Sequence, residues 1–493
     1  MSATLALARS GHEVTLFERD SVDLGGEWTE AFSWKRPGLP HFHLPHAFLA
    51  RARKELQQNA PDVLDSVLAH GGFEVDLSQK IPGGPTKPED EDLIAVGARR
   101  PLLEWAFRRS LADEPNAQVV GATEVTGLAF IEGLPPRVTG VIVDGSEVHA
   151  DLVVDATGRN SKVPEWLATA GVKLQIGSSD CQTNYYCRYF KFKEGADMPK
   201  GPWPFGPRAD TGYSGYNTFY GDNGTFAVIQ TIPNWDRELR ILRHEQAWMH
   251  FARCMNGLDY LVDENHSEPI TGILPMGNLH NRINDTFPEG DPAVLGLQSI
   301  GDAYVHTNPM LAWGLSISLI HAFELPRSIE RTDGHLYELA ADFRNKTWSD
   351  ALAYYRTSTE LDGSRSARWR GEPIDPLSAD SPKALFLGVA GGIAGTKDPD
   401  VFRRTTRRVM LLDSVDDLES DAEALAMIER TAREVVAANP PKPPGPSRQE
   451  LLHQLSTLKS VTAGNRSRAT SSLVVDVNPS PLVQSEPPAE SLH

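Results

Sequence analysis

The chain has 493 residues, of which 40% are hydrophobic, enough for two or three domains, and its formal net charge is −18. This acidic balance argues against a nucleic-acid partner and an anionic membrane surface, because both attract basic proteins. The sequence has no run of eighteen apolar residues, no secretory signal pattern, and no disulfide or metal spacing among its three cysteines, so we expect a cytoplasmic protein without a membrane span.

The first twenty residues predict a buried helix followed by a strand. Alanine and leucine occupy residues 5–8 on every side of that helix, and Gly11 suits its C-terminal cap. The strand Val14–Phe17 is apolar and ends at Glu18. An acidic residue at the end of the second strand of a dinucleotide-binding unit binds the adenosine ribose. Glu18 is therefore a candidate for that contact, although a solvated Glu at a strand end is common.

A dinucleotide-binding unit also needs a glycine-rich phosphate loop, which begins roughly 20 residues before that acid. Counting back from Glu18 passes Met1. Either the start of the chain is misassigned, or the chain is short and binds its dinucleotide weakly or not at all. We favour the first explanation because every downstream element is present. The glycine-rich run at residues 387–395 is no substitute, since Pro399 follows it closely and no acid-ended strand comes after it.

Two arginines are candidates for contacting a phosphate. Arg36 lies in a Pro- and His-rich stretch, residues 33–46, which is expected to be a loop. Arg100 opens a predicted helix over residues 100–111, with a proline at the favoured first position. A guanidinium donates two parallel hydrogen bonds to a phosphate, although either arginine alone would more often lie at a surface.

The middle of the chain is predicted to be rich in strands. Residues 118–154 alternate in short β-like runs and end in an apolar strand that leads into the turn DATGR, with Thr157 and Gly158. Residues 173–231 mix aromatic, β-branched and glycine residues, which is typical of an antiparallel sheet.

A second strand-turn-helix unit follows. An apolar strand at residues 294–297 leads to Gly301 and Asp302, and a long apolar helix covers residues 310–325. Glycine allows close approach of a ligand to the backbone, and the aspartate can accept hydrogen bonds from sugar hydroxyls. The N-terminus of the helix carries partial positive charge and free N–H groups, which stabilise an anionic ligand edge.

The segment GDAYVHTNPMLAWGL resembles the second flavin motif of the para-hydroxybenzoate-hydroxylase-like monooxygenases. The resemblance implies that Gly301 and Asp302 approach the ribityl chain of FAD and that Pro309 lies beside the reactive face of the flavin. Gly314 and Leu315 continue the motif at the start of the helix. The sequence departs from the family by having Met, Leu and Trp at positions 310, 311 and 313, where small or polar residues are usual.

Other segments resemble the same flavoproteins. GHEVTLFER is similar to the strand that binds the FAD ribose, through Glu18 with Arg19 beside it. DATGR resembles the middle motif, in the variant of halogenase- and reductase-like relatives. The residues that the resemblance assigns to the cofactor are Thr157 and Gly158 near the pyrophosphate, Arg36 on a loop over the flavin, Arg100 on the pyrophosphate and Val125 beside adenine.

The resemblance covers Met1 to about Leu325 and implies an α/β fold: an FAD-binding Rossmann-like (aromatic-hydroxylase-like) domain with an inserted antiparallel β substrate domain and a C-terminal helical region. The expected domains are residues 1–172 with 286–330 for FAD, incomplete at the N-terminus, 173–285 for substrate, and 331–438 for the helices. From residue 439 the chain is Pro- and Ser-rich and is expected to be disordered, apart from a candidate short helix at Arg448–Leu458.

The resemblance implies that NAD(P)H reduces FAD, that O2 is captured as a flavin peroxide, and that oxygen is transferred to an apolar organic substrate. The stretch HFHLPH and the run AWGLS indicate the branch related to polyether epoxidases. Hydroxylation and epoxidation both fit, and the flavin performs the chemistry, so no catalytic side chain is required.

Three alternatives remain. A flavin-dependent halogenase is one, although the segment PWPF at residues 202–205 only distantly resembles the halogenase motif WxWxIP. A reductase of the geranylgeranyl-reductase kind is another, because DATGR suits it. The third is a degenerate flavoprotein without a phosphate loop and without catalytic activity.

Aromatic residues of the β-rich block either line an apolar substrate cavity or pack in the core of a sheet. They are Tyr185, Tyr186, Tyr189, Trp203, Phe205, Tyr216 and Tyr220. The histidines at positions 41, 43, 46, 306 and 321 do not have the spacing of a metal site. Those at 41–46 follow Arg36 closely, which makes a role near the flavin a hypothesis.

Overall fold

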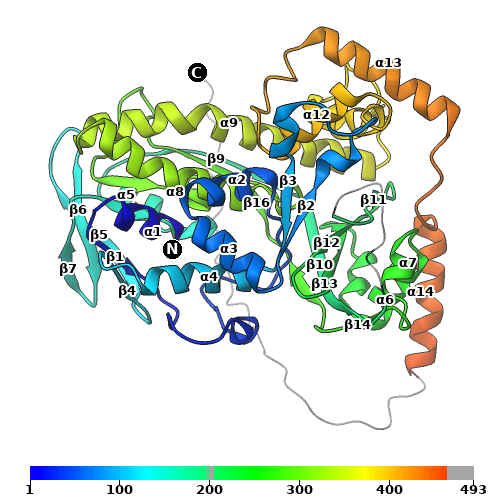
Figure 1. Cartoon of the computed structure of the whole chain (residues 1–493), viewed down its shortest axis with the longest axis horizontal. Coiled ribbons are helices and arrows are strands. Elements are labelled where there is room, and N and C mark those ends of the chain that lie inside the picture. The colour runs from blue at the N-terminus through cyan, green and yellow to red at the C-terminus, as the bar shows by residue number, and fades with distance from the viewer. Residues whose placement is uncertain (197, 199–204, 464–493) are drawn as a thin grey trace, which may run out of the picture.

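The computed structural model describes residues 1–196, 198 and 205–463, with the backbone alone for 458–463. The strands form separate groups with helices packed around and between them, and the long α9 (Leu336–Trp369) runs along the top of the view (Figure 1). Trp203 and most of the PWPF segment lie outside the described residues.

Two parallel strand pairs form the part of the chain that resembles a nucleotide-binding unit. β1 (Val14–Phe17) pairs with β4 (Ala117–Val120), and β8 (Val153–Asp155) pairs with β17 (Leu297–Ser299). Among the described strands, neither β1 nor β17 has a second neighbour. The two pairs therefore stay separate, whereas a doubly wound sheet has the strand before its glycine-rich loop at the centre.

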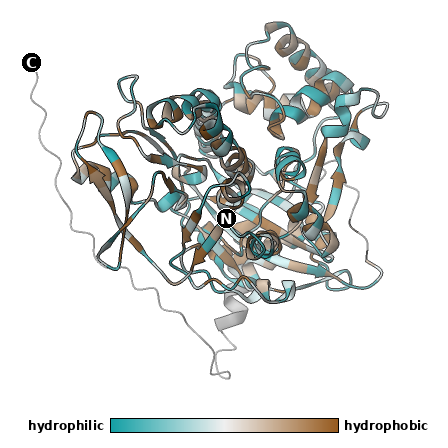
Figure 2. Ribbon diagram, turned by 60° about the vertical axis from the view of Figure 1, so that its left-hand side comes forward, coloured by the Kyte–Doolittle hydropathy of each residue, from teal (hydrophilic) through white to brown (hydrophobic). Residues whose placement is uncertain are grey.

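Helices cover these strand pairs because their apolar faces pack against one another. Six of the eight residues of α1 (Ser2–Arg9) are buried, and the helix packs on α8 (Gly314–Arg331) and α4 (Arg100–Ala112). The prediction of a buried first helix is confirmed, and Gly11 follows it with φ +88°. Figure 2 shows hydrophobic and hydrophilic positions alternating along the helices, as expected for elements with one buried face.

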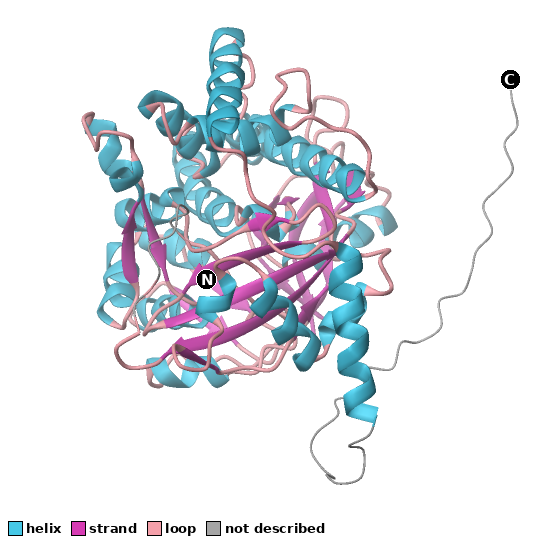
Figure 3. Cartoon of the chain, turned by 90° about the vertical axis from the view of Figure 1, so that its right-hand side faces the viewer, coloured by secondary structure: helices cyan, strands magenta, loops and turns pink. Residues whose placement is uncertain are grey.

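The central block of the chain is a six-stranded antiparallel sheet, in the order β11-β12-β13-β10-β14 with β15 also pairing β10. Every residue of β13 is buried. Helices cover one face of the sheet (Figure 3), where Val228 and Ile232 pack, and Ile229 packs in a separate buried cluster. The strands are β10 (Thr183–Phe192), β11 (Ala209–Asp210), β12 (Gly215–Tyr220), β13 (Thr225–Pro233), β14 (Ser267–Pro269) and β15 (Leu274–Met276), and the helices are α6 (Glu245–Cys254), α7 (Leu258–Leu261) and α14 (Arg448–Ala463).

Helix α14 lies in the C-terminal tail, at the place where the sequence offers a short helix. The candidate helix at Arg448–Leu458 is present and extends to Ala463. Leu451 and Leu455 are buried in the core shared by α6 and the sheet. Arg448 also forms an ion pair with Asp236, with Nε and Oδ2 2.9 Å apart. The i, i+4 spacing of the two leucines provides the apolar face that holds this helix in place.

The remaining elements complete three smaller sheets and the helical region. They are β2 (Phe73–Asp76) with β3 (Ile94–Gly97); β5 (Val125–Ile131), β6 (Arg137–Val143) and β7 (Ser146–His149); β9 (Gln175–Asp180), β16 (His280–Asp285) and β18 (Val305–His306); and α2 (Ala50–Asn59), α3 (Pro61–Ala69), α5 (Val163–Thr169), α10 (Lys383–Phe386), α11 (Gly392–Ala394), α12 (Pro399–Val409) and α13 (Ala422–Ala438). The glycine-rich run 387–395 is helical and packs in a buried cluster with α12 and α13, which confirms its interpretation as a packing element.

Candidate functional site

Two strand ends place two turns beside each other. Because β8 and β17 are parallel, their carboxyl ends lie at one edge, and the turns at residues 158–160 and 301–303 contact each other. Asp155 holds the first turn: its Oδ1 accepts hydrogen bonds from the Thr157 amide (3.0 Å) and hydroxyl (2.6 Å). The structure thus brings the predicted Thr157 and Gly158 next to the predicted Gly301 and Asp302.

Gly301 has a conformation and a contact that together require glycine. Its φ is +56°, and a Cβ added there would lie 2.7 Å from Oγ of Ser318. Its amide donates a hydrogen bond to Nδ1 of His321, 3.1 Å away. Burial lowers the pKa of His321 to about 3, so the imidazole is neutral and Nδ1 is free to accept.

Asp302 lies at the N-terminus of α8. A Cβ added to Gly314, the first residue of this helix, would lie 3.5 Å from Asp302 Oδ1. The imidazole of His306 lies beside it, with Nε2 3.9 Å from Oδ2. In the described part of the chain no donor forms a hydrogen bond with this carboxylate, and 24% of its side chain is exposed. Asp302 therefore has lone pairs available for the hydroxyl groups of a ligand.

Two guanidinium groups near Asp302 lack an anionic partner within the described residues. Burial lowers the pKa of Arg100 to about 10, while Asp302 acts in the opposite direction. Burial also lowers the pKa of Arg159, again opposed by Asp302. The neighbouring Arg99, in contrast, forms an ion pair with Asp222, with Nη2 and Oδ1 2.6 Å apart. Both side chains are half-buried. A partly desolvated cation without a counter-ion is costly, so Arg100 and Arg159 favour an anionic ligand here.

Neutral imidazoles complete this cluster. His46 Nδ1 donates to the Leu44 carbonyl oxygen (2.8 Å), which leaves its Nε2 to accept from Arg100 Nη1 at 3.2 Å. Burial, and then the charge of Arg100, lower the pKa of His46 to about 3. The same two causes lower the pKa of His41. The histidines therefore add no competing charge beside Arg100.

At the end of β1, Arg36 is surrounded by carboxylates. Its buried guanidinium forms ion pairs with Glu18 (2.6 Å) and Asp20 (3.0 Å) and a third with Glu104. It has no hydrogen bond or ion pair with residues 301–315, all of which are described. Arg36 thus neutralises three carboxylates at the end of β1. Its place on a loop over the flavin stays a prediction.

Arg19 and Val125 also lie at this end of β1. Arg19 is exposed and donates from Nη2 to the Gly38 carbonyl oxygen (2.9 Å). Val125 begins β5, two residues after Thr123, whose amide donates to the Glu18 carbonyl oxygen (2.9 Å). Their roles at the adenosine end of a dinucleotide stay predictions.

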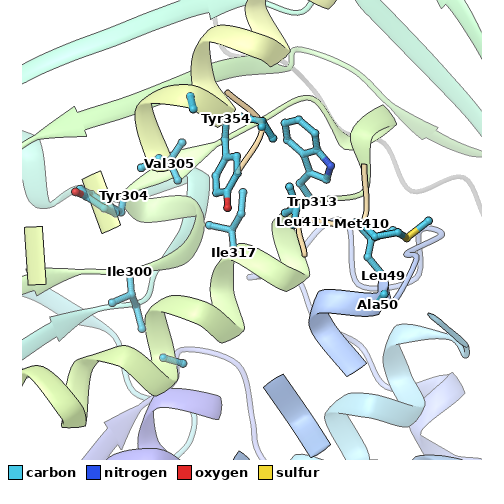
Figure 4. Packing of buried hydrophobic residues seen from close by; sticks show 14 of the residues in the cluster. Leu49, Ala50, Ile300, Tyr304, Val305, Trp313, Ile317, Tyr354, Met410 and Leu411 are labelled. Atoms are coloured by element: carbon cyan, nitrogen blue, oxygen red, sulfur yellow. The ribbon is translucent and has the colours of Figure 1, made fainter. Parts of the chain in front are cut away.

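The turn at residues 309–312 joins the Asp302 turn to α8, and its two flanks are held inside the protein. On one side is the buried Asn308; on the other is Trp313, 2% exposed, whose Nε1 donates to the Val409 carbonyl oxygen (3.0 Å). The Trp313 ring packs among Tyr354 and Leu411 (Figure 4). The unusual tryptophan is therefore a core residue, and Leu315 likewise packs against a buried cluster.

The aromatic residues of the β-rich block divide by environment. Tyr186, Tyr216 and Tyr220 pack in the core beneath α6, which supports the packing interpretation for these three. Phe205 lies in a different buried cluster. Tyr185 donates a hydrogen bond to Asn308 and so lies close to the turn at 309–312. Clefts of 480 Å³ on the β6–β7 surface and 680 Å³ between α1 and the end of α8 contain no residue of segment 301–315.

Sequence reasoning missed several residues of the site. Glu104 lies four residues after Arg100 on one helix, a spacing that could have marked it as a neighbour on the same face. Arg159 belongs to the DATGR turn itself, and His306 follows Asp302 by four residues. No sequence signal indicates that Asp20 meets Arg36, because their contact depends on how the loop at 33–46 folds back.

Comparison with known proteins connects this geometry to a fold. No family model matches the chain. Protein Rv3254 of Mycobacterium tuberculosis is 29% identical over 439 residues, covering 82% of this chain and 85% of that protein. PqsL of Pseudomonas aeruginosa, described as a probable FAD-dependent monooxygenase, superposes with a TM-score of 0.53 and 13% identity, covering 75% of this chain and 95% of its own. The flavin-dependent brominase Bmp2 superposes with a TM-score of 0.58 and 14% identity, covering 89% and 96%.

The chain therefore has the fold of PqsL and Bmp2. This flavoprotein fold confirms the predicted α/β class of the aromatic-hydroxylase-like kind. Among the described residues, no helix is long and apolar enough to cross a membrane. The same ranges hold no group of three or more His, Cys, Asp or Glu side chains that could bind a metal ion.

Proposed function

We propose that this protein is an FAD-dependent oxidoreductase and, within that class, a monooxygenase that hydroxylates or epoxidises a small apolar organic molecule. One observation carries the proposal. In a flavoprotein fold, the Asp302 carboxylate has no hydrogen-bond donor among the described residues, and it lies at the N-terminus of α8, near the guanidiniums of Arg100 and Arg159. Free acceptors beside unpaired cations suit a ligand that carries both hydroxyl groups and phosphates.

The residues present fit FAD group by group. Asp302 would accept hydrogen bonds from the ribityl hydroxyls, and Arg100 and Arg159 would donate to the pyrophosphate. Glu18 would accept from the adenosine ribose, since its side chain remains 22% exposed although Arg36 already binds Oε2. The glycine-rich loop is the one part of such a site that these residues do not supply.

Bound FAD would accept hydride from NAD(P)H and react with O2, which is chemistry that no side chain provides. The chain's own residues orient and shield the ring. The free N–H groups at the start of α8 stabilise negative charge on a reduced flavin. Trp313 seals the far side of the turn with apolar packing and so excludes water there. We further expect a cytoplasmic location.

The substrate class has two supports. Of the aromatic side chains of the β-rich block, Tyr185 reaches the turn beside the proposed flavin face. PqsL, which shares the fold, has been crystallised with 2-aminobenzoylacetate, a small organic molecule. Bmp2 is a brominase, so halogenation is the second candidate. Conversion of substrate under 18O2 with bromide present separates the two: monooxygenation labels the product with 18O, and halogenation adds bromine.

Titration of the purified chain with FAD tests the proposal directly. We expect flavin fluorescence to be quenched on binding, and Asp302→Asn and Arg100→Ala each to raise the Kd. Loss of one hydrogen bond to a charged group costs roughly 1.5–3 kcal/mol, which corresponds to a Kd about ten- to a hundredfold higher.

The matched control is Asp151→Asn. Asp151 is an exposed carboxylate before the strand that leads into the DATGR turn, and this variant should retain the wild-type Kd. Absence of any FAD binding by the wild-type chain would refute the proposal for this chain. Equal affinity of Asp302→Asn and wild type would refute the placement of the ribityl group.

A further inference from the structure

Asn308, the residue before Pro309, is held by buried hydrogen bonds on every polar atom of its side chain. Its Oδ1 accepts from the Tyr185 hydroxyl and from the Met310 amide, the latter at 3.0 Å. Its Nδ2 donates to Oδ1 of Asp362 at 2.7 Å. Asn308 is 1% exposed and Asp362 is 2% exposed, so water does not compete for these contacts. The side chain of Asn308 can therefore adopt only one orientation.

A second set of contacts surrounds this link. Asn281 on β16 donates from Nδ2 to Oδ2 of Asp362 (2.8 Å). Its Oδ1 accepts from the amide of Asn308 (2.8 Å) and from the hydroxyl of Ser358 (2.7 Å). Arg365 forms an ion pair with Asp362, and its Nη1 donates to Sδ of Met310 (2.8 Å). Both residues that flank Pro309 are thus tied to one carboxylate.

The buried carboxylate is the centre of this network. Burial raises the pKa of Asp362, whereas Arg365 and the amide donors of Asn281 and Asn308 act in the opposite direction. Ser358, Asp362 and Arg365 come from α9, Tyr185 comes from β10, and Asn281 comes from β16. Replacing these polar groups by apolar ones would be the simpler way to fill a core, because an isolated buried charge is destabilising. The network instead defines the position of one short turn.

We propose that Asp362 is a positioning residue for the flavin reaction: through Asn308 and Arg365 it fixes the turn Pro309–Ala312 that carries the proposed flavin face. This inference rests on the proposed function. Trp313 holds the other side of the same turn through its indole donor and its apolar contacts. Because both flanks of the turn are fixed, the position and orientation of Pro309 relative to the start of α8 are fixed as well. Asp362 would therefore influence how the flavin ring lies without contacting it.

Asp362→Asn tests this role, because it keeps the shape of the side chain and removes its charge. In the full chain without FAD, we expect the amides of Asn308 and of residues 310–312 to exchange hydrogen about tenfold faster than in wild type, as a loss of local order requires. With FAD added, we expect the absorption maxima of the bound flavin to shift and the Kd to rise. Asp350→Asn, on the same helix but without a hydrogen bond to Asn308 or Asp362, is the matched control and should leave both properties unchanged.

Unchanged exchange and an unchanged flavin spectrum in a folded Asp362→Asn protein would overturn the inference. If that variant fails to fold, Tyr185→Phe replaces it, since it removes only the hydroxyl that donates to Asn308; the same shifts are expected at smaller size, and wild-type behaviour would again overturn the inference. The two proposals fail differently. If the wild-type chain takes up no FAD, both the proposed function and the flavin role of Asp362 are refuted. If the wild-type chain binds FAD and the variants match it in hydrogen exchange and flavin spectrum, only the positioning role is refuted.

Discussion

Gly301 and His321 show how single residues define the turn beside Asp302. The glycine adopts a positive φ and lies too close to Ser318 for any side chain, so its backbone N–H points inward and needs an acceptor. His321 supplies that acceptor from within α8, and its burial keeps the ring neutral. His321, one of the buried residues of α8, is therefore part of the site.

Because of His321, the free energy of unfolding should decrease as the pH is lowered. Its pKa is lowered to about 3 in the folded chain, against about 6.5 in an unfolded one. Between these values the unfolded state binds a proton that the folded state does not, so stability is lost as the pH falls from about 6.5 toward 3. At pH 5 this one group costs about 2 kcal/mol.

His321→Asn, which retains an acceptor at the Nδ1 position, should therefore reduce the loss of unfolding free energy between pH 7.5 and pH 5.0 by about 2 kcal/mol. Urea denaturation at the two pH values measures it. His149→Asn, an exposed histidine on β7, serves as the control. The same pH dependence in wild type and His321→Asn would contradict the assignment of a neutral buried ring.

At the scale of elements, α14 shows that the sheet core depends on a segment distant in sequence. Leu451 is fully buried beside α6, whereas the adjacent Leu452 is only partly buried. We expect Leu451→Ala to lower the free energy of unfolding by about 2–5 kcal/mol, because it leaves a cavity, and Leu452→Ala to lower it less. Chemical denaturation of both variants measures the difference; equal small effects would mean that α14 does not hold the sheet.

The elements that the sequence predicted well are those with a local signal. The buried helix before Glu18, the strand-turn-helix at Gly301–Leu315 and the apolar helix after it follow from periodicity and turn residues. The ion pairs of Arg36 could not be predicted, because its partners Asp20 and Glu104 are far apart in sequence and meet only through folding. The Pro-rich composition before α14 favoured disorder, and only the packing of that helix on α6 outweighs it.

At the scale of the whole molecule, the proposed cofactor would bridge two strand pairs that do not pair with each other. The β1–β4 and β8–β17 pairs share no backbone hydrogen bond, and Glu18 and Asp302 lie at the ends of different pairs. A single FAD that contacts both would stabilise the folded chain by RT ln(1 + [FAD]/Kd), about 2.7 kcal/mol at a hundredfold excess over Kd. We expect Tm to rise with FAD concentration in differential scanning calorimetry and to stay constant with riboflavin, which lacks the phosphates. An equal rise with riboflavin would count against the role of Arg100 and Arg159.

Helix α9 has 34 residues, about 50 Å of continuous backbone, and it holds both the polar network at Asp362 and the apolar contacts of Trp313 through Tyr354. The substrate selectivity of this protein could therefore be changed through residues of α9, which are not among those proposed to contact FAD. Libraries directed at the inward face of α9 would reshape the turn at Pro309 while every residue proposed to touch FAD keeps its identity. Such variants would change substrate selectivity without replacing any residue proposed to bind FAD.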